Sequence, residues 1–142
     1  MVGTIDQFRA QLIGGGARPN QFKVEINSPP GITTGLPTEN AAFLCKASQL
    51  PSMTIGEIAL PFRGRQVYIA GDREFPDTWT TTFMNDTNFL IRNALERWNN
   101  GINDLVTGTG VVVSADYQAD LKVSQLDRDD NVLKVYIFRN AW

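Results

Sequence analysis

The sequence predicts a mainly β domain, a β-sandwich or partly open barrel of antiparallel strands with a flanking α-helix and a short N-terminal helix. Three observations support this fold class. Short segments of β-forming residues alternate between apolar and polar side chains, most are joined by turn residues typical of hairpins, and only two segments carry apolar residues at helical spacing. The 142 residues contain no internal repeat, and we expect them to form a single domain over residues 1–142.

An N-terminal arm is expected over residues 1–16. Thr4 and Gln7 fit a capping box at the start of a helix that runs from Thr4 to Ile13, and Gly14–Gly16 ends it. The apolar stripe of this helix consists of Ile5, Phe8 and Leu12. Because a helix of about ten residues is marginal alone, we expect it to dock either on the body of its own chain or on a neighbour.

Alternating patterns predict six strands, at residues 22–26, 43–47, 66–70, 79–84, 117–123 and 132–138. In the second of these, Phe43, Cys45 and Ala47 are expected to share one face. Residues 71–74 are predicted to be the turn of a hairpin joining the third and fourth strands. Residues 127–131 are predicted to be a tight turn before the last strand. Residues 27–40, rich in proline, are predicted to be a loop.

An amphipathic helix is expected after the fourth strand. Asn85, Asp86 and Thr87 cap it, it runs to about Asn99, and Gly101 ends it. Its apolar face consists of Leu90, Ile91, Ala94, Leu95 and Trp98. We expect this face to cover one side of the sheets.

The segment from Ser48 to Phe62 does not fit an ordinary element. Its prolines, Pro51 and Pro61, argue against a central strand, whereas its apolar content argues against a solvated loop. The apolar residues are Leu50, Met53, Ile55, Ile58, Leu60 and Phe62. Apolar residues on an exposed excursion indicate an interface. The alternative is that the segment folds back onto its own core.

Composition excludes much of enzyme chemistry. The chain has no histidine, which removes Ser-His and Cys-His catalysis and histidine-ligated metals. Its single cysteine, Cys45, cannot form an internal disulfide and is expected to be a small core residue. The net charge of −2 disfavours a general nucleic-acid binder. No apolar run approaches the ~20 residues of a membrane span, and no targeting segment is evident.

Two weak patterns of acidic residues remain. Asp127, Asp129 and Asn131 match the first half of a calcium-binding loop, but Val132 and Phe138 stand where glycine and glutamate are needed.

Asp72, Glu74 and Asp77 could suggest the paired carboxylates of a glycoside hydrolase, but a solvated turn explains them better. Gly14–Gly16 lacks the residues that follow a phosphate-binding loop. We therefore expect no catalytic residue, no cofactor and no metal.

Several stretches, in order, resemble one family. They are residues 17–26, 43–51, 70–86 and 92–101, with a weaker match from Tyr117 onward. Together they resemble the tail tube proteins of contractile-tailed, T4-like bacteriophages. This resemblance implies a structural protein of the virion tail, assembled in the host cytoplasm, and no enzyme.

The resemblance also implies an assembly. Its six-fold rings stack into a hollow tube, which carries DNA from the capsid to the host without binding it specifically. The implied partners are further copies of the chain and the tail sheath, tape measure, baseplate and tail terminator proteins. After the stretch like Ile137–Trp142 the family has a further pair of strands. The member is then either short or truncated, with the C-terminal hairpin of the family missing.

The resemblance assigns roles to the unusual segments. Residues 48–63 are the extended inter-subunit loop, with the N-terminal helix as a second arm. The expected interface residues are Ile5, Phe8, Leu12, Leu50, Met53, Ile55, Ile58, Leu60 and Phe62. The polar positions expected to face the lumen are Asp116, Gln118 and Asp120.

Three other hypotheses stay open. The same architecture would serve as the inner tube of a tailocin or of a type VI-like contractile injection system. A monomeric ligand-binding β-sandwich and a hydrolase using the Asp72 cluster are the others.

Overall fold

The computed structural model describes residues 3–75 and 78–142. In chain order its elements are α1 (Ile5–Gln11), the 3-10 helix η1 (Ile13–Gly15), β1 (Phe22–Ile26), α2 (Thr38–Leu44), β2 (Cys45–Ser48), β3 (Thr54–Phe62), β4 (Arg65–Glu74), β5 (Thr81–Phe83), α3 (Leu90–Ile102), α4 (Ser114–Tyr117), β6 (Ala119–Leu126) and β7 (Val132–Ala141). The strands form three antiparallel sheets, β1-β6-β7, β2-β5 and β3-β4.

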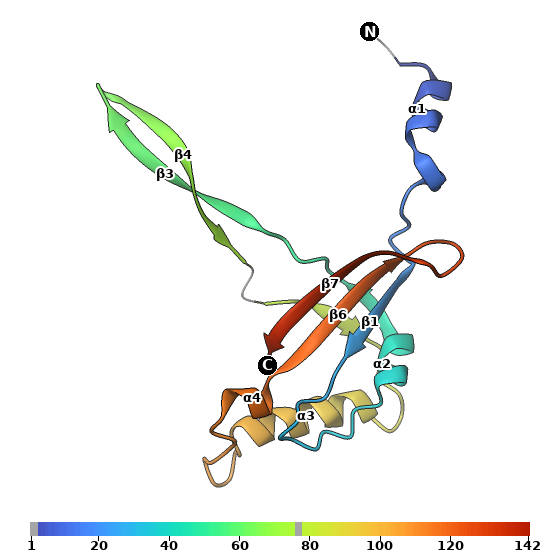
Figure 1. Ribbon diagram of the computed structural model, residues 1–142. Helices are drawn as coiled ribbons and strands as arrows, with labels where there is room; N and C mark the ends of the chain where they lie inside the picture. Colours follow the sequence, from blue (N-terminus) through green and yellow to red (C-terminus); the bar gives the residue numbers. More distant parts are fainter. Residues whose placement is uncertain (1–2, 76–77) are drawn as a thin grey trace.

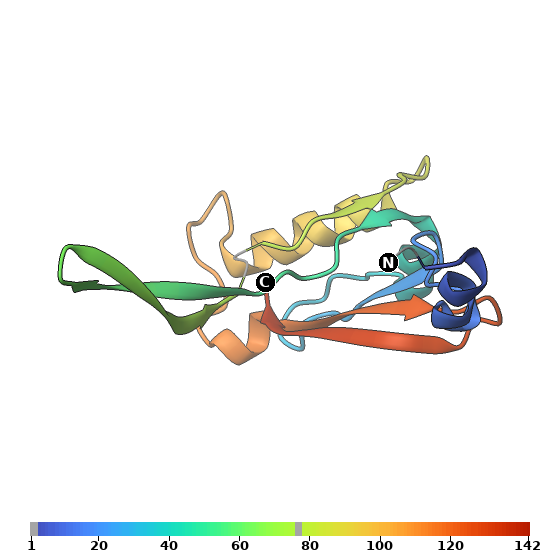
Figure 2. The same ribbon diagram turned by 90° about the horizontal axis from the view of Figure 1, so that it is seen from above.

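The body of the molecule is a small sandwich. The β1-β6-β7 sheet faces the β2-β5 sheet, and α3 lies along one side of the two (Figures 1 and 2). The buried core between them consists of Val24, Ile26, Trp98, Ala119 and Val123. Trp79, just before β5, stacks on Phe138 of β7 with 4.6 Å between the ring centroids. The predicted mainly β class is confirmed, and no closed barrel forms within residues 3–75 and 78–142.

Strand alternation positions the core. Val24 of β1 pairs with Val123 of β6, and both are fully buried, whereas their neighbours Glu25 and Lys122 pair on the outer face. The predicted turn before β7 is confirmed, because the Asp127 N–H donates to the Asn131 carbonyl at 2.8 Å.

Helix α3 buries three of the five residues predicted for its apolar face, whereas Leu90 and Leu95 are each 39% exposed. Ile91, Ala94 and Trp98 are buried, and the Trp98 Nε1–H donates to the Tyr117 carbonyl at 2.8 Å. The helix begins at Leu90, later than expected, with its N–H donating to Asp86 Oδ1 at 3.1 Å. It also runs through Gly101 to Ile102, so the prediction that Gly101 ends it is wrong.

The predicted strand at residues 43–47 is wrong in its first half. Phe43 and Leu44 end helix α2, and the strand itself is Cys45–Ser48. The Phe43 side chain is 88% exposed, so it does not share a core face with Cys45. An alternating pattern of only five residues is also compatible with the last turn of a helix. This ambiguity explains why Phe43 and Leu44 are wrongly predicted to lie in the strand. Part of α2 also falls within the predicted loop.

The pairing predicted for residues 66–70 is also wrong. These residues lie in β4 and pair with β3, while β5 pairs with β2. Residues 71–74 continue β4, and the turn lies at Arg63 and Gly64, which have φ of 47° and 76°. Two central residues with positive φ are what a two-residue type I′ hairpin turn requires. Pro61 is tolerated because both strands of a two-stranded sheet are edges.

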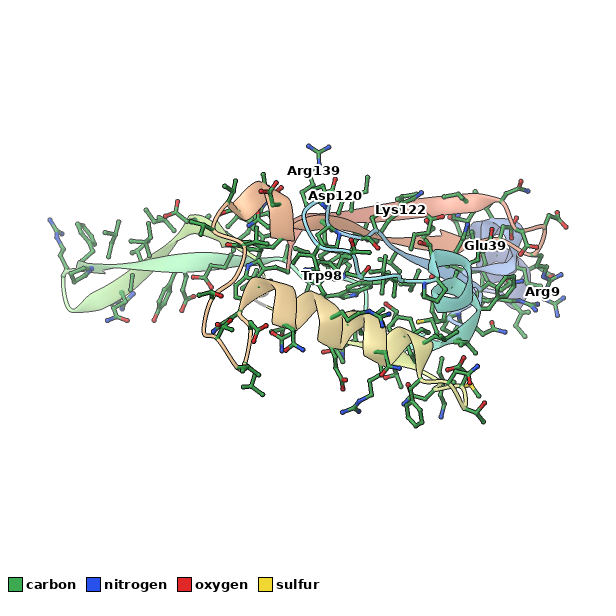
Figure 3. The ribbon with its side chains drawn as sticks, turned by 90° about the horizontal axis from the view of Figure 1, so that it is seen from below. Arg9, Glu39, Trp98, Asp120, Lys122 and Arg139 are labelled. Atoms are coloured by element: carbon green, nitrogen blue, oxygen red, sulfur yellow. The ribbon has the colours of Figure 1, made fainter. Side chains whose placement is uncertain are left out.

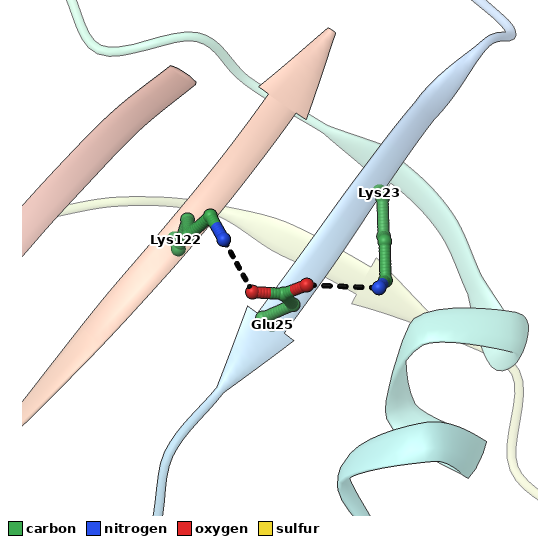
Figure 4. Close-up of polar contacts among 3 residues, drawn as sticks. All are labelled: Lys23, Glu25 and Lys122. Atoms are coloured by element: carbon green, nitrogen blue, oxygen red, sulfur yellow. Dashed lines mark hydrogen bonds and ion pairs between the residues drawn. The ribbon is translucent and has the colours of Figure 1, made fainter. Parts of the chain in front are cut away.

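A three-residue ion network lies on the outer face of the β1-β6-β7 sheet (Figure 4). The Glu25 carboxylate accepts from Lys122 Nζ and from Lys23 Nζ, each at 2.8 Å. These hydrogen bonds, that of Lys122 first, lower the pKa of Glu25, and the pKa of Lys23 is raised mainly by its hydrogen bond to Glu25. The network joins β1 to β6 across a face that is still partly in solvent.

Replacing Gly101 with alanine should destabilise the body. Alanine normally stabilises a helix interior by about 1 kcal/mol relative to glycine. Here a Cβ would lie 2.7 Å from two carbons of Ile32, so the substitution should instead cost about 1–3 kcal/mol. Urea unfolding of Gly101→Ala checks this, with Asn100→Ala as the control. A variant more stable than the parent would contradict the packing.

Replacing Glu25 with glutamine should destabilise the chain in a pH-dependent way. A carboxyl whose pKa is lowered by folding stabilises above its unfolded pKa, near 4.5, and loses this effect as pH falls through the lower folded value. Because the three side chains are partly exposed, we expect a loss of about 0.5 kcal/mol at pH 7.

Urea unfolding of both proteins from pH 7 to pH 2 tests this. The difference between them should shrink below pH 4.5. The control is Glu57→Gln, whose carboxylate makes no ion pair within the described residues. A difference that stays constant over the whole range would rule the network out as its source.

Candidate assembly interface

The β3-β4 hairpin projects away from the body as a two-stranded ribbon (Figures 1 and 2). Every residue of its two strands is exposed except Gly56 and Gly71. An isolated two-stranded hairpin is at best marginally stable in water. The hairpin therefore needs a surface to pack on, and the described part of its own chain, residues 3–75 and 78–142, does not supply one.

The two faces of the hairpin differ in chemistry. Cross-strand partners share a face, so the pairs Ile58–Ile69, Leu60–Val67 and Phe62–Arg65 lie on one side. The apolar members of this face, Ile58, Leu60, Phe62, Val67 and Ile69, are 46–62% exposed. We call these five residues the apolar hairpin face. The opposite face carries Glu57, Ala59, Pro61, Gln66, Tyr68 and Ala70.

The N-terminal helix is a second uncovered element. The predicted capping box is confirmed, because the Gln7 N–H donates to Thr4 Oγ1 and the Thr4 N–H donates to Gln7 Oε1. Helix α1 buries none of its residues, and it stands clear of the sheets in Figure 1. The three glycines of Gly14–Gly16 have positive φ, which glycine adopts without strain. Of the two docking hypotheses, the one on its own body is therefore wrong.

All nine residues predicted to form the interface are exposed in the single chain. They are Ile5, Phe8, Leu12, Leu50, Met53, Ile55, Ile58, Leu60 and Phe62. The alternative in which residues 48–62 fold back onto the core is thus wrong. Sequence reasoning missed Val67 and Ile69, which complete the apolar hairpin face. Their alternation predicts a strand but does not show that the strand pairs with β3 in a projecting hairpin.

The three predicted lumen residues do not share one sheet face. Asp116 lies in α4 and Gln118 lies between α4 and β6, and both are half-buried. Only Asp120 is on a strand, where its Oδ1 accepts from the Asn140 N–H at 3.2 Å. Figure 3 shows Asp120, Lys122 and Arg139 on the side of the sheet that faces away from α3. The prediction extended the alternation two residues beyond the start of the strand.

An apolar cavity of about 380 Å³ lies between the sheets and α3. Its lining includes Trp79, Phe83, Trp98, Leu121 and Trp142, and none of its lining residues is titratable. General acid–base catalysis needs a titratable side chain within reach of the substrate. This cavity therefore provides no basis for hydrolysis.

The acidic candidates also lack an enclosed site. Asp72 and Glu74 lie exposed on β4, and Asp77 falls outside the described residues. No group of three or more potential metal ligands occurs within the described parts of the chain. The Cys45 thiol is half-buried, and burial raises its pKa, which disfavours the reactive thiolate. Within residues 3–75 and 78–142, no helix combines the length and apolar character needed to cross a membrane.

Comparison with known proteins places the chain in a family. Residues 17–142 match the model of the family described as phage tail tube protein. The chain is 34% identical to tail tube protein gp19 of Enterobacteria phage T4 and 33% identical to that of phage T6, each over 96% of this chain and 79% of the relative. It is 29% identical to the tail tube protein of Serratia phage KSP90, over 99% of this chain and 80% of the relative. The chain therefore belongs to the phage tail tube protein family, whose members are structural components of the virion.

Proposed function

We propose that this chain assembles with copies of itself into six-fold rings that stack as the inner tube of a contractile tail, the conduit for DNA ejection into the host. The observation that carries the proposal is the apolar hairpin face, which its own chain leaves in water. An uncovered apolar ribbon on a member of the tail tube family is most simply covered by a neighbouring subunit.

The geometry supports a propagating assembly over a closed dimer. The hairpin and the N-terminal helix both extend from the body (Figure 1), so their contacts reach surfaces other than themselves. Such heterologous contacts generate rings where the rotation closes and filaments where it does not. Ring closure would also cover β1 and β7, the two edge strands of the main sheet. The number six and the stacking come from the family resemblance.

The role of conduit needs no catalytic residue or cofactor. It requires a wall that does not hold its cargo, and the net charge of −2 gives the chain no excess of positive charge for binding phosphates. The tail sheath, tape measure, baseplate and tail terminator proteins are the further partners that this role implies.

Electron microscopy of the purified chain in negative stain tests the proposal. We expect rings or tubes of one uniform diameter, with assembly rising steeply with concentration. Sedimentation velocity over the same concentrations gives the control, because it detects species too small to image. A chain that stays monomeric at every concentration would contradict the proposal.

Placing a charge on the apolar hairpin face should block assembly. Leu60→Asp puts a carboxylate where a neighbour is expected to pack, and burying an unpaired charge costs at least about 2 kcal/mol. Since each 1.4 kcal/mol is about tenfold, the concentration needed for assembly should rise more than about tenfold.

The matched control is Ala59→Asp, which places the same carboxylate one residue away on the opposite face of the hairpin. Circular dichroism of both variants checks that the body is folded, and light scattering gives the assembly threshold. Equal thresholds for the two variants would show that the apolar hairpin face is not the contact.

A further inference from the structure

We propose that the hairpin of one copy packs along strand β7 of a second copy, with its basic tip against the acidic β6–β7 turn of that copy. This inference rests on the proposed function, since it names the surface of the neighbouring subunit that the hairpin contacts.

Strand β7 carries an apolar stripe on its outer face. Tyr136 and Phe138 pair with Val123 and Leu121 and point into the core side of the sheet. Val135 and Ile137, which pair with Ser124 and Lys122, therefore lie on the opposite face, and Leu133 lies next to them at a register shift of the ladder. The three side chains are 39–54% exposed. Within residues 3–75 and 78–142 these three side chains stay partly exposed, and Ile137 lines a pocket together with Phe75 and Thr78.

The stripe on β7 and the apolar hairpin face have the same spacing. On β3 the residues Ile58, Leu60 and Phe62 alternate in the same way as the three residues on β7. At about 3.3 Å per residue, each stripe is about 13 Å long. Side chains of the two strands can therefore lie opposite one another along the whole stripe.

The charges beyond the two stripes are of opposite sign. The hairpin tip carries Arg63 and Arg65, with no acidic residue between positions 58 and 71. The Arg63 guanidinium lies 5.4 Å from the centre of the Phe62 ring, so the tip is both aromatic and basic. The β6–β7 turn carries Asp127, Asp129 and Asp130 and a single arginine. None of these charges takes part in an ion pair within residues 3–75 and 78–142.

The two charged ends lie at opposite ends of the molecule in both ribbon views (Figures 1 and 2). They cannot meet within one copy, so the contact is head to tail and propagates from copy to copy. When Ile58 lies opposite Ile137 and Phe62 opposite Leu133, the two strands are antiparallel. The tip that follows Phe62 and the turn that precedes Leu133 then lie at the same end of the contact. The arginines of the tip then come level with the aspartates of the turn.

The apolar and charged parts have different roles. The stripes bury the area that holds the subunits together, whereas exposed ion pairs add little affinity. Complementary charge instead sets the register of the two strands and excludes the reversed orientation.

Charge reversal on both sides tests the pairing. The tip variant is Arg63→Glu/Arg65→Glu, and the turn variant is Asp127→Lys/Asp129→Lys. Each variant alone brings like charges together, and its assembly threshold should rise at least tenfold. An equimolar mixture should form tubes at the threshold of the unchanged chain, because each reversed group meets its complement and the remaining contacts keep the original signs.

Three controls make the outcome decisive. Arg63→Lys/Arg65→Lys keeps the tip basic and should assemble, and Lys46→Glu, a reversal on β2 away from both surfaces, should assemble as well. Circular dichroism checks the fold, and the single pair Arg65→Glu and Asp129→Lys replaces the double variants if either unfolds.

The outcomes separate this inference from the proposed function. Tubes from the mixture, with none from either variant alone, support the pairing. If the unchanged chain forms tubes but the mixture does not, the pairing is overturned and the proposed function stands. If the unchanged chain stays monomeric, both are overturned.

Discussion

The uncovered apolar face of the β3-β4 hairpin is the constraint on which the proposed assembly depends. A two-stranded ribbon exposes backbone on both edges and, here, five apolar side chains on one face. The body has its own core around Val24, Val123 and Trp98 and does not need the hairpin. The hairpin, in contrast, stays exposed on both strands within residues 3–75 and 78–142, which is the reason for proposing that a neighbouring subunit covers it.

The body is built to hold the hairpin at its base. The Trp79 Nε1–H donates to the Gln49 carbonyl at 2.8 Å and so joins the segment after β4 to the segment before β3. The same indole stacks on Phe138 of the main sheet. The Trp79 side chain thus connects both ends of the β3-β4 hairpin to the core. A neighbouring subunit that binds the hairpin would therefore also position the body. This coupling suits a subunit whose contacts must repeat identically along a tube.

Sequence reasoning predicted the local elements better than their pairing. The capping box of Thr4, strand β1, the 127–131 turn and the buried side of α3 follow from spacing of a few residues, and the structure confirms them. The hairpin was missed because alternation identifies a strand but not its partner, and because Pro61 argued against a strand without regard to edges. The exposed positions of the candidate interface were anticipated from their apolar content. The lumen positions stay a prediction, and two of them, Asp116 and Gln118, lie outside the strand because period-two patterns do not show where a strand such as β6 begins.

Amide hydrogen exchange, compared between the dilute chain and the assembled tube, tests the central claim most directly. The account predicts that β3 and β4 exchange rapidly in the dilute chain, while β1 and β6 are protected by the core. On assembly the amides of the hairpin should become protected to the level of the body. A hairpin that is already protected in the dilute chain, or one that still exchanges rapidly in the tube, would contradict the claim that a neighbouring subunit stabilises it.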